Sequence, residues 1–211
     1  MSGPAPALHI PANYGLRLPE SWWNLDLDPS TRDGSIRRRI MAEVGEDIPA
    51  DAREGLDSLI RAARRSAREA HARGALQFAG MFDLMEDGSV LLGNVMVLRF
   101  DLPEGAPADL TELMLAYAVR GARNPMGKGT RARQSEIIEL PHAGPAGRAT
   151  SVEDIDFYGR GRARLAIMQT IVPVPGTGSI LVVVGTTPNL TLVDPFFDMF
   201  DAIASTLTFD V

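Results

Sequence analysis

The first group of residues that could carry chemistry is the glycine-rich stretch GKGT at residues 127–130. In nucleotide-binding proteins such a loop holds phosphate oxygens with backbone N–H groups and a lysine, and the next serine or threonine binds Mg²⁺. Here the upstream Gly121 lies one residue too far from the lysine, and Gly129 stands in the metal-binding position. A helix, rather than the required strand, is expected before the loop. The sequence therefore favours a plain polar loop.

The stretch DLDPS at residues 26–30 could begin a calcium-binding loop or carry a phosphatase nucleophile. A calcium loop needs glycine at its sixth position and glutamate at its twelfth, where this sequence has Thr31 and Arg37. A phosphatase nucleophile needs a buried strand before the first aspartate, and Trp-Trp-Asn is a poor one. We therefore interpret these aspartates as turn residues whose side chains accept backbone N–H hydrogen bonds ahead of a helix.

Neither the histidines nor the acidic residues on the expected strands are spaced like a known catalytic or metal-binding site. The histidines lie far apart, without the spacing of paired metal ligands, and no GxSxG sequence supports a serine nucleophile; they are His9, His71 and His142. Five acidic residues on neighbouring expected strands could cluster, but exposed strand faces are commonly acidic; they are Glu136, Glu139, Glu153, Asp154 and Asp156. We assign no catalytic, cofactor-binding or metal-binding residue and leave open whether the protein is an enzyme.

Two features could instead bind a partner, and the first is the adjacent pair Trp22 and Trp23. In an extended chain neighbouring side chains point to opposite faces, so one tryptophan should face the core and the other should face outward. An exposed tryptophan often marks a partner surface. The competing interpretation, which the sequence favours, is that the outer ring covers a hydrophobic edge of the fold.

The second feature is a run of arginines on one side of the helix expected over residues 50–73, with Glu69 as the nearby acidic residue. Such a face could bind an acidic protein segment, a phosphate or an anionic membrane surface. A solvated helix face is the simpler interpretation. The candidate partner-binding residues of this feature are Arg61, Arg64, Arg65 and Arg68.

Composition narrows the function classes. The 211 residues are 45% hydrophobic and 23% charged, as in ordinary globular domains. A net charge of −6 gives no general attraction to nucleic acid. The absence of cysteine excludes disulfides, thiolate catalysis and a lipoprotein anchor cysteine. The opening MSGPAPALHIPANYG lacks the features of a signal peptide, and no apolar run suits a membrane helix. We expect a cytoplasmic protein without a cofactor or membrane segment.

The closing stretch of the chain indicates the fold most clearly. Residues 163–172 and 180–187 have the pattern of two strands joined by the turn PVPGTG, and the second is apolar enough to be covered on both faces. Asp194 and Pro195 suggest the N-cap and first residue of a helix. Its apolar residues recur every three or four positions, which is typical of ordinary core packing. The final residues TFD could run back along the sheet.

The rest of the chain supplies further strands and helices. We expect a strand over 9–18, helices over 35–44 and 50–73, a hairpin of 76–85 and 90–100, a capped helix from 109, and strands over 134–140 and 147–157. Hairpins dominate, so the fold class should be α+β, with a mostly antiparallel sheet of about six to seven strands covered by helices. We expect a loose arm over 1–8 and one domain over 9–211, with a helical insertion at about 35–73.

Three stretches resemble the PsbP-like α/β sandwich superfamily: the strand that leads into LPESWW, the turn ELPHAGPAGR, and the ending VPVPGTGSILVVVGTTP followed by FFDMFDAIASTLTF. That superfamily includes the photosystem II extrinsic protein, Ran-binding import factors, bacterial lipoproteins and chaperones of secreted toxins. The chain departs from the lipoproteins, since it has neither signal peptide nor cysteine, and it has the extra helical insertion. The resemblance implies a binding or chaperone role and carries over no functional residue.

Together these observations predict a non-enzymatic cytoplasmic module that binds another protein, as an accessory, adaptor or chaperone. The alternative is a small-ligand-binding protein or enzyme with a pocket between sheet and helices. A third hypothesis is binding of an anion or membrane surface by the arginine face. The partner's identity and self-association of the chain stay open.

Overall fold

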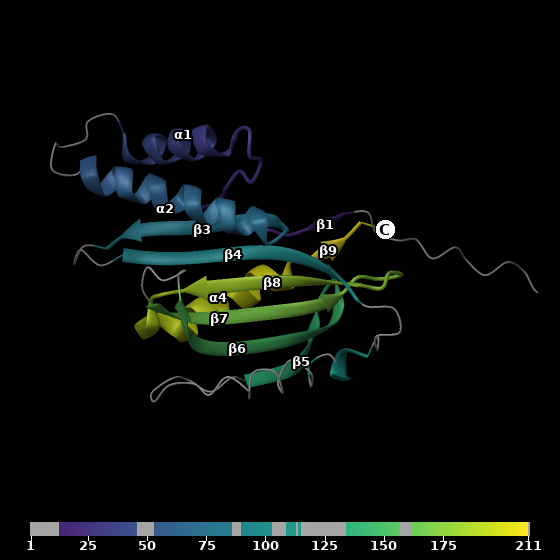
Figure 1. The fold of residues 1–211 in the computed structure, drawn as a ribbon. Coiled ribbons are helices and arrows are strands. Elements are labelled where there is room, and N and C mark those ends of the chain that lie inside the picture. Colours follow the sequence, from purple (N-terminus) through teal and green to yellow (C-terminus); the bar gives the residue numbers. More distant parts are fainter. Residues whose placement is uncertain are drawn as a thin grey trace, which may run out of the picture.

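The computed structural model describes residues 13–45, 53–85, 90–102, 109–112, 114, 134–156 and 162–210. Seven strands form one sheet in the order β2-β3-β4-β8-β7-β6-β5, with every neighbouring pair antiparallel (Figure 1). This confirms the predicted α+β class and the antiparallel sheet. The strands are β2 (Trp23–Asn24), β3 (Ala75–Leu84), β4 (Val90–Asp101), β5 (Gln134–Leu140), β6 (Gly144–Asp156), β7 (Arg162–Pro173) and β8 (Ser179–Thr187).

Strand β8 lies at the centre of this sheet, between β4 and β7. Its side chains alternate between two cores: Leu181 and Val183 pack on one face, and Val182 packs on the other. The prediction that the nearly continuous apolar sequence of β8 is covered on both faces is therefore confirmed, because helices pack on both sides of this central strand.

Helix α4 (Val193–Ser205) covers one face and follows the 3₁₀ turn η1 (Leu190–Leu192). Phe196 and Phe200 on α4 are 4% and 3% exposed, and their ring centroids lie 5.9 Å apart. Glycines make room for these rings: a Cβ atom on Gly93 would lie 2.8 Å from the Phe196 ring. The apolar stripe predicted for this helix is thus core packing, as expected.

Helices α1 (Arg32–Val44) and α2 (Arg53–Ala72) cover the opposite face near β3 (Figure 1). Ile36 and Ile40 of α1 and Ile60 of α2 form a cluster with Phe78 of β3. The predicted helical insertion therefore packs on the sheet of its own chain. Gly74 ends α2 with a φ of 76°, the left-handed conformation that glycine adopts readily at this position.

The helical residues 110–112 and 114 cover a further part of the sheet face on which α1 and α2 pack. Leu110 and Met114 are buried against Ile171 of β7 and Val182 of β8. The predicted cap is present, since Asp109 Oδ1 accepts the Thr111 N–H at 2.8 Å. Within the described chain, the sheet is thus a central layer with α4 on one side and the other helices opposite.

Several predicted boundaries are wrong. Helix α4 begins at Val193 with Leu192 as N-cap, so Asp194 does not cap it, and Pro195 occupies the first turn, where its missing N–H costs little. Strand β6 begins at Gly144 rather than 147, because the 141–143 turn is shorter than expected.

The two ends of the described chain also differ from prediction. The final strand β9 (Thr208–Phe209) does not join the main sheet: it pairs with β1 (Tyr14–Gly15) in a separate two-stranded sheet. That pairing leaves only two described residues of the predicted 9–18 strand in a ladder. The arm over 1–8, the hairpin turn over 86–89 and the loop over 123–133 lie outside the described residues.

Candidate functional site

The two tryptophans lie on opposite faces of the sheet edge, as the alternation predicts. Trp22 is 6% exposed and its ring meets that of Phe200 edge-on, with centroids 6.3 Å apart and planes at 86°. This burial removes Trp22 from any surface that a partner could reach. Trp23 stands opposite Gly80 in the β2–β3 register and is half-buried against the α1–α2 cluster.

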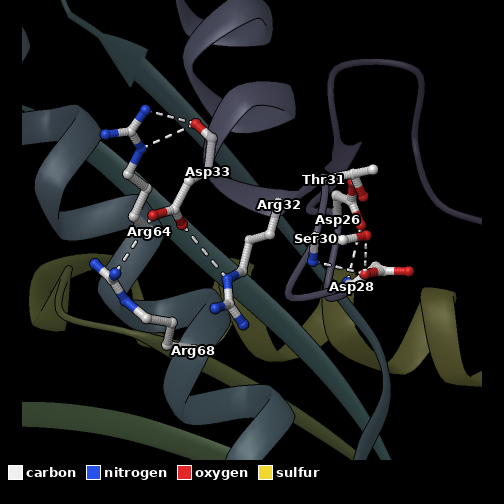
Figure 2. A network of polar contacts seen from close by, with 8 residues as sticks. All are labelled: Asp26, Asp28, Ser30, Thr31, Arg32, Asp33, Arg64 and Arg68. Carbon is white, nitrogen blue, oxygen red and sulfur yellow. Dashed lines mark hydrogen bonds and ion pairs between the residues drawn. The ribbon is translucent and has the colours of Figure 1, made fainter.

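The candidate arginines separate into two pairs, and the first pair fastens α2 to the start of α1 (Figure 2). The Arg64 guanidinium donates two hydrogen bonds to the Asp33 carbonyl oxygen, from Nε at 2.9 Å and from Nη2 at 2.6 Å. The Asp33 carboxylate lies 3.4 Å from Arg68 Nη1 and 3.5 Å from Arg32 Nε. Arg64 therefore serves the packing of the two helices against each other, whereas Arg68, whose side chain is 51% exposed, adds a surface contact.

The second pair, Arg61 and Arg65, is exposed. Neither side chain forms an ion pair with any residue that the structure describes. Arg37 and Arg38 on α1 are exposed as well. The cationic surface available to a partner is thus smaller than the sequence indicates, because Arg64 is engaged within the fold.

The aspartate turn before α1 has the predicted form (Figure 2). Asp26 Oδ1 accepts the Asp28 N–H at 2.9 Å, and Asp28 Oδ1 accepts the Ser30 hydroxyl and N–H at 2.6 and 2.7 Å. Both hydrogen bonds from Ser30 lower the pKa of the Asp28 carboxyl below its ordinary value, and the bond from the hydroxyl has the larger effect. Among the described residues no group of three potential metal ligands occurs.

Of the five acidic residues considered on the strands, Glu136 and Asp154 form ion pairs. Arg148 of β6 pairs with Glu136 of β5 at 2.7 Å and with Asp201 of α4. Asp154 of β6 pairs with Arg164 of β7 at 2.8 Å. These contacts connect neighbouring strands and one helix, so Glu136 and Asp154 have a structural role.

The candidate site is a pocket of about 420 Å³ between the helices α1 and α2 and the outer edge of β3. The turn over Glu20 and Ser21 and the side of α1 at Arg39 complete its rim. We call it the Trp23 pocket. Its apolar lining consists of Trp23, Ile40, Leu59, Met81 and Phe82.

A turn and a short strand border this pocket. The Trp22 N–H donates to the Pro19 carbonyl at 2.9 Å, and Glu20 and Ser21 of this turn line the pocket. Strand β2 pairs with β3 at two register positions, Gly80 and Ala79, and the Leu25 N–H then donates to the Phe78 carbonyl at 2.8 Å. Beyond Gly80, the outer edge of β3 over 81–84 is paired with no strand in the described part of the chain. Phe82 on this edge is 42% exposed.

Sequence reasoning found Trp23 but missed the rest of this lining. Alternation along the 76–85 strand does place Phe78, Gly80 and Phe82 on one face, which was the available signal. It could not show that Phe82 stays partly exposed beside α1 and α2, because that depends on how the two helices lie on the sheet.

The fold and the pocket define an antiparallel α+β domain with an open sheet edge. No protein-family model matches the sequence, and no curated protein matches it either. Among solved structures, the chain is similar to LpqN of Mycobacterium tuberculosis, a protein described as involved in cell envelope biogenesis, with 9% sequence identity and a TM-score of 0.48. That alignment covers 94% of this chain and 83% of LpqN. The resemblance to the PsbP-like superfamily stays a prediction at this level of likeness.

None of the described helices is both long and apolar enough to cross a membrane.

Proposed function

We propose that this chain is a non-enzymatic protein-binding module, and that it binds an extended segment of its partner along the outer edge of β3. The observation that carries the proposal is the Trp23 pocket, because it lies directly beside an unpaired strand edge. An added strand would form backbone hydrogen bonds with β3 over 81–84, and one apolar side chain of the segment would enter the pocket. The role would be that of an accessory, adaptor or chaperone.

The composition of the pocket suits a protein partner. Apolar rings and aliphatic side chains form the lining, while Glu20, Arg39 and Asp83 stand at the rim. An apolar centre within a polar rim is the usual organisation of protein interfaces. Of the residues singled out from the sequence, Trp23 belongs to this surface. Trp22 and Arg64 are engaged within the fold, and Arg68 is exposed beside Asp33.

The exposed arginines Arg61 and Arg65 supply the second element of the proposal. They are unpaired cations within the described part of a chain whose net charge is −6. Neither arginine lines the Trp23 pocket. Charges outside a contact area mainly raise the association rate with an acidic partner, and salt screens them. We therefore expect the partner to carry acidic residues outside the segment that enters the pocket.

The test is selection of peptides from a displayed random library on the wild-type protein, followed by affinity measurements. Replacing Phe82 by glutamate places a charge at the pocket. Loss of one buried phenylalanine contact is worth about 1.5–3 kcal/mol, so binding should weaken roughly 10- to 150-fold. The matched control is Phe100→Glu, since Phe100 is 46% exposed at the other end of the neighbouring strand. Selected peptides that bind all three proteins equally would refute the proposal.

A small-molecule ligand in the same pocket is the second candidate. Its support is the pocket volume of about 420 Å³, since ligand sites commonly measure about 300–1,000 Å³. A fragment screen by ligand-observed NMR, with Phe82→Glu as the negative control, separates this candidate from peptide binding. Cytoplasmic location and self-association remain predictions from the sequence.

A further inference from the structure

A second pocket, of about 250 Å³, lies at the opposite end of the sheet from η1 and the start of α4, where the small β1–β9 sheet covers it. We call it the Arg99 pocket. Leu181, which is opposite Arg99 in the β4–β8 register, belongs to the core on the α4 face. The walls are apolar or aromatic apart from one cation and one amide; they include Tyr14, Leu76, Val174, Leu181 and Phe209.

Arg99 is the one charged residue of this lining. Its Nε and Nη2 atoms donate to the Ser179 hydroxyl at 3.2 and 3.0 Å, which holds one edge of the guanidinium in place. Ser179 is itself only 3% exposed, and its hydroxyl also hydrogen-bonds with the Thr177 hydroxyl at 2.8 Å. No carboxylate in the described part of the chain pairs with Arg99, although the chain as a whole is acidic. An oriented, exposed cation that no described carboxylate neutralises therefore stands at the wall of a mostly apolar pocket.

We propose that the Arg99 pocket binds a small monocarboxylic acid with an apolar tail, with the carboxylate on the Arg99 guanidinium and the tail against the apolar walls. Arginine presents several N–H donors in a plane that matches a carboxylate. At about 30 Å³ for each water-sized group, the volume holds roughly eight such groups, which suits one short acid and is too small for a run of residues. This inference is independent of the protein-binding function.

Tyr14 supports the same ligand class. Its hydroxyl lies 3.4 Å from Gln77 Oε1, and burial raises the pKa of Tyr14 to about 12. The phenol is neutral at physiological pH even with the ordinary tyrosine pKa, so it does not repel a bound carboxylate, and its ring forms part of the pocket wall.

The test compares hexanoate with hexanamide, which has the same tail and no charge, by NMR titration of the isotopically labelled full chain. Hexanoate should bind at least fivefold more tightly than hexanamide, and the shifting resonances should include Tyr14 and Leu76. Arg99→Gln should lower hexanoate affinity about tenfold or more and leave hexanamide affinity unchanged. Arg65→Gln, on the exposed side of α2, is the matched control and should change neither.

Three results would overturn the inference. The first is equal affinity of the wild-type protein for hexanoate and hexanamide. The second is a set of shifts confined to the Trp23 pocket, and the third is the absence of any shift at about 10 mM hexanoate, a concentration that detects even weak binding. All three are measured on the wild-type protein, so the inference stays testable if Arg99→Gln fails to fold. None of them bears on peptide binding at β3.

Discussion

Replacing Arg64 by glutamine tests whether this arginine stabilises the packing of α2 against α1. The variant loses two hydrogen bonds from a charged donor to the Asp33 carbonyl, at 2.9 and 2.6 Å. Hydrogen bonds involving a charged group contribute about 1.5–3 kcal/mol. Because Arg64 is only partly buried, we expect a smaller loss, about 1–2 kcal/mol in the free energy of unfolding. For a chain of this size that corresponds to roughly 2–8 °C in Tm.

Urea denaturation followed by circular dichroism measures this loss, with Arg65→Gln as the matched control. Arg65 is adjacent in sequence, exposed, and without an ion pair among the described residues, so its replacement should change stability by less than about 0.5 kcal/mol. Hydrogen exchange should also show faster opening of the first turn of α1 in Arg64→Gln alone. Equal effects of the two replacements would refute the assignment of Arg64 to helix packing.

Two further predictions concern the α4 core and Tyr14. Gly185→Ala should destabilise the fold by about 1–3 kcal/mol, because its Cβ would lie 2.6 and 2.7 Å from two Phe200 ring atoms; Gly178→Ala meets nothing within 4 Å and should be neutral or slightly stabilising in the same urea assay. A Gly185→Ala protein as stable as wild type would contradict the packing of α4. The pKa of Tyr14 is raised to about 12, so the native state retains its proton between about pH 10 and 12 while the unfolded chain loses it, and stability should fall with pH across that window. The ultraviolet absorbance titration of Tyr14→Phe should lack a component near pH 12 that wild type shows, and loss of a component near pH 10 instead would contradict the burial.

The elements that sequence analysis predicted correctly are those with strong local periodicity. Phe196, Phe200 and Ile203 recur at helical spacing, and all three are buried on the α4 face. The apolar run of β8 correctly indicated a strand covered on both faces. The opposite directions of Trp22 and Trp23 followed from strand geometry alone. In each case one element and its nearest neighbours determine the outcome.

What could not be predicted depends on contacts between distant parts of the chain. The engagement of Arg64 rests on the Asp33 carbonyl, which is 31 positions away in sequence. Helical geometry turns the adjacent Arg64 and Arg65 about 100° apart, but only the packing of α1 shows that Arg64 is the one engaged. The β1–β9 pairing joins the two ends of the described chain, and no local pattern specifies that partner.

Each pocket lies where a covering segment meets the sheet: α1 and α2 beside Phe82, and the β1–β9 sheet beside Arg99. Strand alternation indicates the face on which these side chains lie, but the position of the covering segments is a property of tertiary packing.

Backbone hydrogen exchange of the protein with a selected peptide tests the central claim most directly. If the partner segment adds to the sheet, amide exchange within 81–84 of β3 should slow by at least about tenfold on binding, since new hydrogen bonds close that edge. Phe82→Glu should abolish this protection, and Phe100→Glu should leave it intact. Protection confined to the exposed side of α2, at Arg61 and Arg65, with unchanged exchange in β3 would contradict binding at the strand edge.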